Sequence, residues 1–128
     1  ARYHDFEHTL QGTLCLARLL GGYIRAKAQP AVSPRHFELA ILAVLMHDTG
    51  YLKLTGDEEG TGAKFTLVHV ARSAAFAGNL LESHGFKPEE IAAVQHMIKC
   101  TGLNANLAQI PFADETERIL GFSLATAD

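Results

Sequence analysis

The segment Phe37–Asp48, FELAILAVLMHD, constrains the fold more than any other part of this sequence. After its second residue it is apolar on almost every side, and a helix without a polar face must be surrounded by other helices. Ser33 is placed to cap this helix, and Pro34 suits the first helical position, where the missing N–H leaves no hydrogen bond unmade. We therefore expect a central, buried helix that ends in the pair His47-Asp48.

Four further segments have helical patterns, and none has a convincing strand pattern. The expected helices are Phe6–Leu20, which Gly21-Gly22 ends, Phe65–His84, which Gly85 closes, Pro88–Lys99, and a last helix from Glu115 to the end. The glycines and acidic residues of Thr49–Lys64 indicate a flexible loop, which we expect to form a lid beside a site. Together these patterns predict an all-α fold, a compact bundle of about five helices.

The composition places the chain among ordinary globular proteins. Its 128 residues fit a single domain, 1–128, with 48% apolar and 20% charged residues. The net charge of −3 offers no basic surface for bulk nucleic acid binding. No apolar run reaches the roughly 18 residues that a membrane span needs. The chain starts at Ala1 and stops inside a helical pattern at Asp128, so we expect a C-terminally truncated fragment.

The two cysteines, Cys15 and Cys100, lie far apart and form no CxxC pair. In a chain of this size they are expected to be reduced, buried thiols, and a cytoplasmic location follows as the default.

Histidines and aspartates occur at three places where they can meet. His4 and His8 are four residues apart and would share one face of a helix. His47-Asp48 ends the most buried helix, and Asp128 ends the last helix in the apolar context FSLATAD. Burying such groups without partners costs several kcal/mol. Coordination of a metal ion offsets this cost for several groups at once.

Mixed imidazole and carboxylate ligands suit one or two divalent ions, among Fe, Mn, Zn, Co and Mg. For each histidine taken alone, the alternative is an ordinary core or surface residue.

The order of these residues resembles the HD superfamily of metal-dependent phosphohydrolases, and the resemblance covers nearly the whole chain. YHDFEHT, which contains His4 and His8, is similar to the YHNxxHA opening of cyclic-nucleotide phosphodiesterases and of smaller bacterial HD proteins. LMHDTGYLK, around His47-Asp48, is similar to the HDxGK segment of HD phosphodiesterases. The resemblance implies an HD-domain, phosphodiesterase-like helical bundle.

The resemblance also implies roles for individual residues. It makes His8, His47, Asp48 and Asp128 metal ligands, with Asp48 able to bridge two ions, and His4 the proton donor to a leaving oxygen. Tyr51 replaces the second histidine of the HDxxH pattern, and the purine-clamping region is missing, which argues against a cyclic-nucleotide substrate.

Two more histidines stand where six-ligand members of the superfamily insert theirs. His69 lies in LVHVARSA and His96 in AAVQHMIK, between the HD pair and the final aspartate. If both are ligands, the centre holds two metal ions. The alternative is that both face the core and form hydrogen bonds with the backbone.

Two cations accompany these histidines at helical spacing. Arg72 comes three residues after His69, and Lys99 three after His96, so each cation would lie beside a ligand. Such a site suits an anion, because a guanidinium binds phosphate through two parallel hydrogen bonds. The alternative is a pair of solvated surface charges.

We therefore expect hydrolysis of a phosphate mono- or diester, with a small phosphorylated and nucleotide-like substrate. Metal-activated hydroxide would attack phosphorus, Arg72, Lys99 or Lys53 would stabilise the developing charge, and His4 would protonate the leaving oxygen. Two other interpretations stay open: an HD-type di-iron oxygenase, and a non-catalytic signalling domain that binds metal or nucleotide.

Overall fold

A computed structural model describes residues 6–49, 62–102 and 107–127 of the chain. In these residues the fold is all-helical, as expected, and contains no strand. The helices are α1 (Phe6–Arg25), α2 (Pro34–Met46), α3 (Gly62–Ser83), α4 (Pro88–Lys99) and α5 (Glu115–Ala127), with a short 3₁₀ helix η3 (Leu107–Gln109) before α5. The site residues predicted at His4, Lys53 and Asp128 lie outside the described residues, as does most of the predicted loop.

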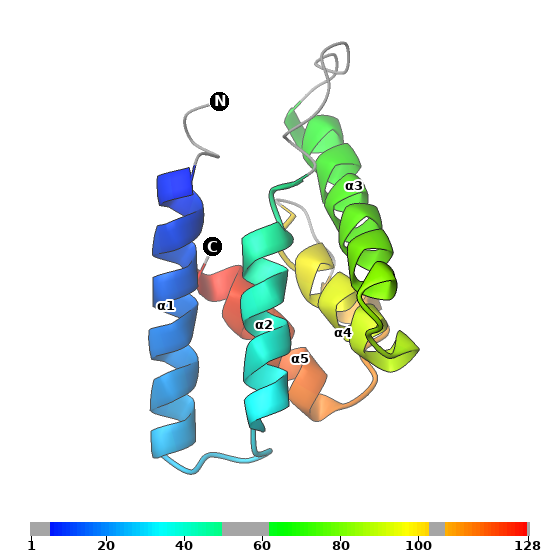
Figure 1. Cartoon of the computed structure of the whole chain (residues 1–128). Coiled ribbons are helices and arrows are strands. Elements are labelled where there is room, and N and C mark those ends of the chain that lie inside the picture. The colour runs from blue at the N-terminus through cyan, green and yellow to red at the C-terminus, as the bar shows by residue number, and fades with distance from the viewer. Residues whose placement is uncertain (1–5, 50–61, 103–106, 128) are drawn as a thin grey trace.

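Helix α2 occupies the centre of the bundle, because it packs against each of the other four α-helices (Figure 1). It starts as predicted: the Ser33 hydroxyl accepts a hydrogen bond from the backbone N–H of His36 at 3.0 Å. The His36 ring accepts one in return from the backbone N–H of Ser33, which completes a capping box. The expectation that α2 is surrounded on all sides is wrong at Leu45, which is exposed to solvent.

Helix α1 is longer than its glycine pair predicts. It runs through Gly21-Gly22 to Arg25, although a glycine inside a helix costs about 1 kcal/mol relative to alanine. Tertiary contacts on both sides outweigh that preference: Leu20 is fully buried, and the Tyr23 hydroxyl donates to the Pro30 carbonyl at 2.6 Å. The helix ends at Arg25, and Lys27, two residues later, adopts the left-handed conformation at φ 55° that often follows the end of a helix.

The remaining helices begin and end close to their predicted residues. Helix α3 begins at Gly62, three residues before the prediction, so the last residues of the predicted loop are helical instead. It ends at Ser83, one residue before the prediction, and Gly85 follows with a φ of +81° that favours glycine. Helix α4 has the predicted bounds, and α5 begins at the predicted Glu115.

Close packing of α3, α4 and α5 depends on small residues. Ala74 and Ala77 of α3 are buried, and the Gln95 side chain of α4 donates to the Ala74 carbonyl at 3.0 Å. Helix α5 approaches α4 at Gly121, where an added Cβ would lie only 2.7 Å from the Cys100 sulfur. The small side chains of Ala74 and Ala77 therefore permit close contact between α3 and α4.

The core gathers apolar side chains from all five α-helices. Its largest fully buried members are Leu16, Leu20, Val44, Val94, Met97, Ile98, Leu120 and Leu124. Cys100 is buried as expected, but the same prediction is wrong for Cys15, which is exposed on the outer side of α1. No helix in the described ranges combines the length and the apolar character of a membrane span.

Candidate metal centre

The end of α2 fixes the position of His47 and the tautomer of its neutral ring. This residue is the C-cap of the helix, with φ −67° and ψ −21°, and its Nδ1 lies 2.6 Å from the Val44 carbonyl oxygen. A carbonyl oxygen only accepts hydrogen bonds, so Nδ1 carries the proton of the neutral ring. The Nε2 atom of His47 then presents a lone pair, which is the form that binds a metal ion.

His8 reaches this point from another helix. Helices α1 and α2 lie side by side and run in opposite directions, so the start of α1 is next to the end of α2 (Figure 1). The Nε2 atom of His8 lies 3.9 Å from Oδ2 of Asp48, and the Nε2 atom of His47 lies 3.4 Å from the same oxygen. One potential ligand atom from each of the three residues lies within 4.8 Å of the other two.

The three side chains are largely shielded from solvent. The exposed fractions are 21% for His8, 3% for His47 and 12% for Asp48. A carboxylate with this little exposure needs a positive charge or several donors beside it. Two imidazoles and one carboxylate are also a usual ligand set for divalent transition metals. The donor chemistry of the cluster therefore fits a divalent ion.

Two predicted site residues, His69 and Arg72, lie on α3. His69 is buried and Arg72 is half-buried one turn further along the helix. Helix α3 contacts α2, which carries His47 at its end. His69 is not among the residues whose ligand atoms converge within 4.8 Å, as far as the described residues go.

His96 has a partner that the sequence did not suggest. Its Nδ1 lies 2.5 Å from Oε1 of Glu117, a buried carboxylate on α5 that also accepts from the backbone N–H of Ala113 at 3.2 Å. The Phe112 ring meets the imidazole edge-on, with centroids 6.2 Å apart. A carboxylate that orients one ring nitrogen is frequent behind metal-binding histidines, but this geometry also suits a structural pair.

A signal for Glu117 does exist in the sequence. It precedes Leu120 by three residues and Leu124 by seven, and both leucines are in the core. Residues at this spacing share one helix face, so a glutamate there is turned inward and needs a partner.

Cys100 lies near this pair and is not reactive. Burial, followed by the charge of Glu117, raises the pKa of the Cys100 thiol to about 12, so the thiol stays protonated and unreactive. Lys99, the predicted cation beside His96, is exposed at the last turn of α4.

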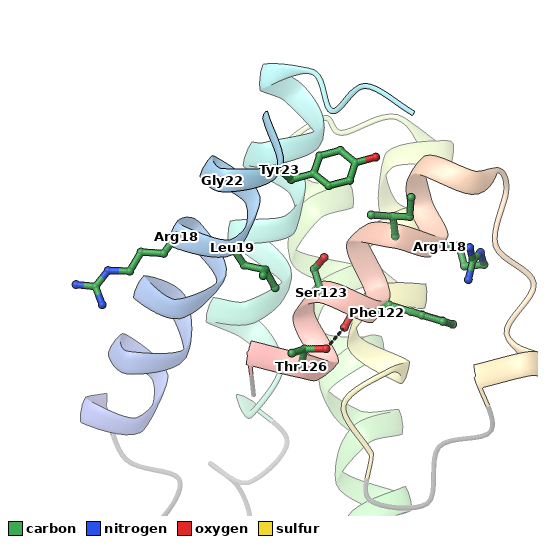
Figure 2. A pocket seen from close by; sticks show the side chains of 9 residues that line it. Arg18, Leu19, Gly22, Tyr23, Arg118, Phe122, Ser123 and Thr126 are labelled. Carbon is green, nitrogen blue, oxygen red and sulfur yellow. Dashed lines mark hydrogen bonds between the residues drawn. The ribbon is translucent and has the colours of Figure 1, made fainter. Parts of the chain in front are cut away.

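A groove of about 580 Å³ between α1 and α5 does not include the cluster (Figure 2). Its polar groups are largely engaged: the Tyr23 hydroxyl donates to Pro30, and the Thr126 hydroxyl donates to the Phe122 carbonyl. Arg118 pairs with Glu115 and lies over the Phe122 ring. Few polar groups are left to converge on a ligand, so the groove is the weaker candidate for a chemical site.

No family model, curated protein or solved structure matches this chain. Membership of the HD superfamily therefore stays a prediction from the sequence motifs.

Proposed function

We propose that this chain binds a divalent metal ion through His8, His47 and Asp48 and hydrolyses a phosphate mono- or diester. The observation that carries the proposal is the convergence of these three side chains, from the start of α1 and the end of α2, within 4.8 Å. A metal ion bound there supplies Lewis acidity, which polarises a phosphoryl oxygen and makes water more acidic.

The protein's own contribution begins with the fixed ring of His47. The Val44 carbonyl holds a proton on Nδ1, so the neutral form of the ring presents the lone pair of Nε2 to the site. Asp48 supplies the negative charge of the site, and His8 closes it from the side of α1.

In this proposal the substrate is bound by the cations Arg72 of α3 and Lys99 of α4. A half-buried guanidinium keeps more of its electrostatic strength than an exposed ammonium, so Arg72 is better suited than Lys99 to hold phosphoryl oxygens. In the same proposal His4 protonates the leaving oxygen, Lys53 adds positive charge, and His69, His96 and Asp128 complete a second metal site. A nucleotide-like substrate is the favoured class.

The test is phosphoester hydrolysis by the chain loaded separately with Mn²⁺, Fe²⁺, Co²⁺, Zn²⁺ or Mg²⁺. Suitable substrates are p-nitrophenyl phosphate, bis(p-nitrophenyl) phosphate and a panel of nucleotides. We expect turnover with at least one metal and a loss of at least about a hundredfold in kcat/KM for Asp48→Ala. His84→Ala, which changes an exposed histidine on the loop after α3, is the matched control and keeps full activity.

Two other results would replace this proposal. Bound metal without turnover of any substrate would favour a non-catalytic binding domain. Iron with oxygen-dependent turnover would favour an oxygenase that uses the same ligands.

A further inference from the structure

The outer side of α1 carries an apolar stripe formed by Leu10, Leu14, Ala17, Gly21 and Ile24. The three large members are well exposed, at 44% for Leu10, 47% for Leu14 and 42% for Ile24. Steps of four and three residues alternate along the stripe, which is the spacing of a seam between two packed helices. Exposed apolar side chains in such a row mark an interaction surface more often than scattered ones do.

Large and small residues occupy different halves of the stripe. Leu10 and Leu14 occupy its first half, whereas Ala17 and Gly21 occupy its second half. A second α1 that runs in the opposite direction, centred between Leu14 and Ala17, places each leucine opposite a small residue. Large against small fills the space between two helices, whereas a parallel arrangement sets leucine on leucine and leaves gaps at the glycines.

The charges at the ends of the stripe favour the same arrangement. Glu7 lies in the first turn of α1 and Arg25 in the last turn, and both are exposed. The Arg25 guanidinium lies beside Gly21, with Nη1 3.3 Å from where a Cβ of Gly21 would be. In the pair, this side chain must turn away from Gly21 so that Leu10 of the other copy can pack there. In an antiparallel pair, Glu7 of each copy comes near Arg25 of the other, and the helix dipoles also oppose each other favourably.

We propose that two copies of this chain pair through this stripe, with their α1 helices antiparallel about a twofold axis. Such an interface is self-complementary, as twofold pairing requires, because the same surface serves both copies. His8 lies near one end of the stripe, so the two metal clusters fall at opposite ends of the interface. The pairing therefore does not depend on the proposed hydrolase activity.

The first experiment measures the mass of the chain by sedimentation equilibrium across a range of concentrations. We expect a dimer that Leu14→Glu weakens by at least about a hundredfold, because each copy would bury a charge in the seam. Phe76→Glu is the matched control: Phe76 is 48% exposed on α3, away from the stripe, and its variant should remain a dimer. Circular dichroism checks that both variants stay helical.

The second experiment tests the antiparallel direction by exchanging the end charges. Glu7→Arg alone and Arg25→Glu alone should each weaken the dimer by about threefold to tenfold, and the double variant should recover most of that loss. A wild-type chain that stays monomeric, and so leaves the stripe to another partner, would overturn the proposal. A dimer whose dissociation constant is unchanged by Leu14→Glu would also overturn it. So would a double variant that dissociates as readily as the single variants.

Discussion

The Nε2 atom of His8 lies 3.9 Å from Oδ2 of Asp48, although the two residues belong to different helices. The antiparallel packing of α1 on α2 creates this proximity, because it places the first turns of one helix beside the last turn of the other (Figure 1). A ligand that binds both side chains therefore joins two elements of the folded state and has no equivalent in the unfolded chain.

Metal binding should accordingly raise the thermal stability of the chain. At a free metal concentration of about 100 times Kd, the folded state gains about 2.7 kcal/mol, which raises Tm by roughly 10 °C for a domain of this size. His8→Ala should remove most of this increase, and His84→Ala should retain it. Thermal unfolding followed by circular dichroism, with and without Mn²⁺, measures both. An equal rise in Tm for His8→Ala would show that the metal binds elsewhere.

Two glycines of the bundle should respond in opposite directions to the same substitution. A Cβ at Gly121 would meet the Cys100 sulfur at 2.7 Å and the Phe112 ring at 3.0 Å, both packed against α5. Among the residues that the structure describes, a Cβ at Gly12 would meet only Val44, at an ordinary 3.7 Å. We expect Gly121→Ala to destabilise the chain by about 1–3 kcal/mol, and Gly12→Ala to stabilise it by about 0.5–1 kcal/mol.

Urea denaturation of the two variants beside the wild type gives both free energies of unfolding. A Gly121→Ala variant as stable as Gly12→Ala would contradict the close approach of α5 to α4.

The pair of His96 and Glu117 should be important for stability. Glu117→Ala leaves Nδ1 of His96 and the backbone N–H of Ala113 without their acceptor, so we expect a loss of about 2–4 kcal/mol. Glu117→Gln keeps an accepting oxygen and should lose less. Glu82→Ala, at an exposed position of α3, should change stability by less than about 0.5 kcal/mol. The same urea experiment measures the series, and equal effects at Glu117 and Glu82 would refute the structural role.

Acid should weaken the link between α2 and α4. The Arg35 guanidinium, which donates to Glu90 at 2.8 and 3.1 Å, lowers the pKa of that carboxyl from 4.5 to about 2. Because the folded-state pKa is the lower one, the pair stabilises the fold above pH 4.5, and this contribution is lost as the pH falls towards 2.

Glu90→Gln should therefore make the free energy of unfolding less dependent on pH between 4.5 and 2, and Arg35→Ala should have the same effect. Denaturant titrations at several pH values measure the slope. A wild-type slope in both variants would show that the ion pair does not contribute.

The helices could be predicted largely from local signals. Ser33 with Pro34, and Pro88 followed by two glutamates, are start signals that act within one turn, and both helices begin where these signals predict. The end of α1 could not be predicted in this way. Its glycine pair favours an end, but packing of Leu20 and the hydrogen bond from Tyr23 to Pro30 extend the helix to Arg25.

In the candidate site, too, local sequence signals predict some features, whereas others depend on how the helices pack. The resemblance to HD proteins implies that His8 shares a site with His47 and Asp48, whereas local spacing alone does not. The packing of α1 on α2 brings ligand atoms of the three residues within 4.8 Å of one another. The partner of His96 was missed because Glu117 comes from α5 and local spacing says nothing about which helix it meets. The exposure of Cys15 was missed for a similar reason, since its side of α1 faces no other part of the described chain closely enough to bury it.

The most direct test of the metal centre is elemental analysis of protein purified without chelators. The account predicts at least about one divalent metal ion per chain, lost in Asp48→Ala and retained in the surface control Glu82→Ala. Wild-type protein that binds no metal even after equilibrium dialysis, or an Asp48→Ala variant with full metal content, would contradict it.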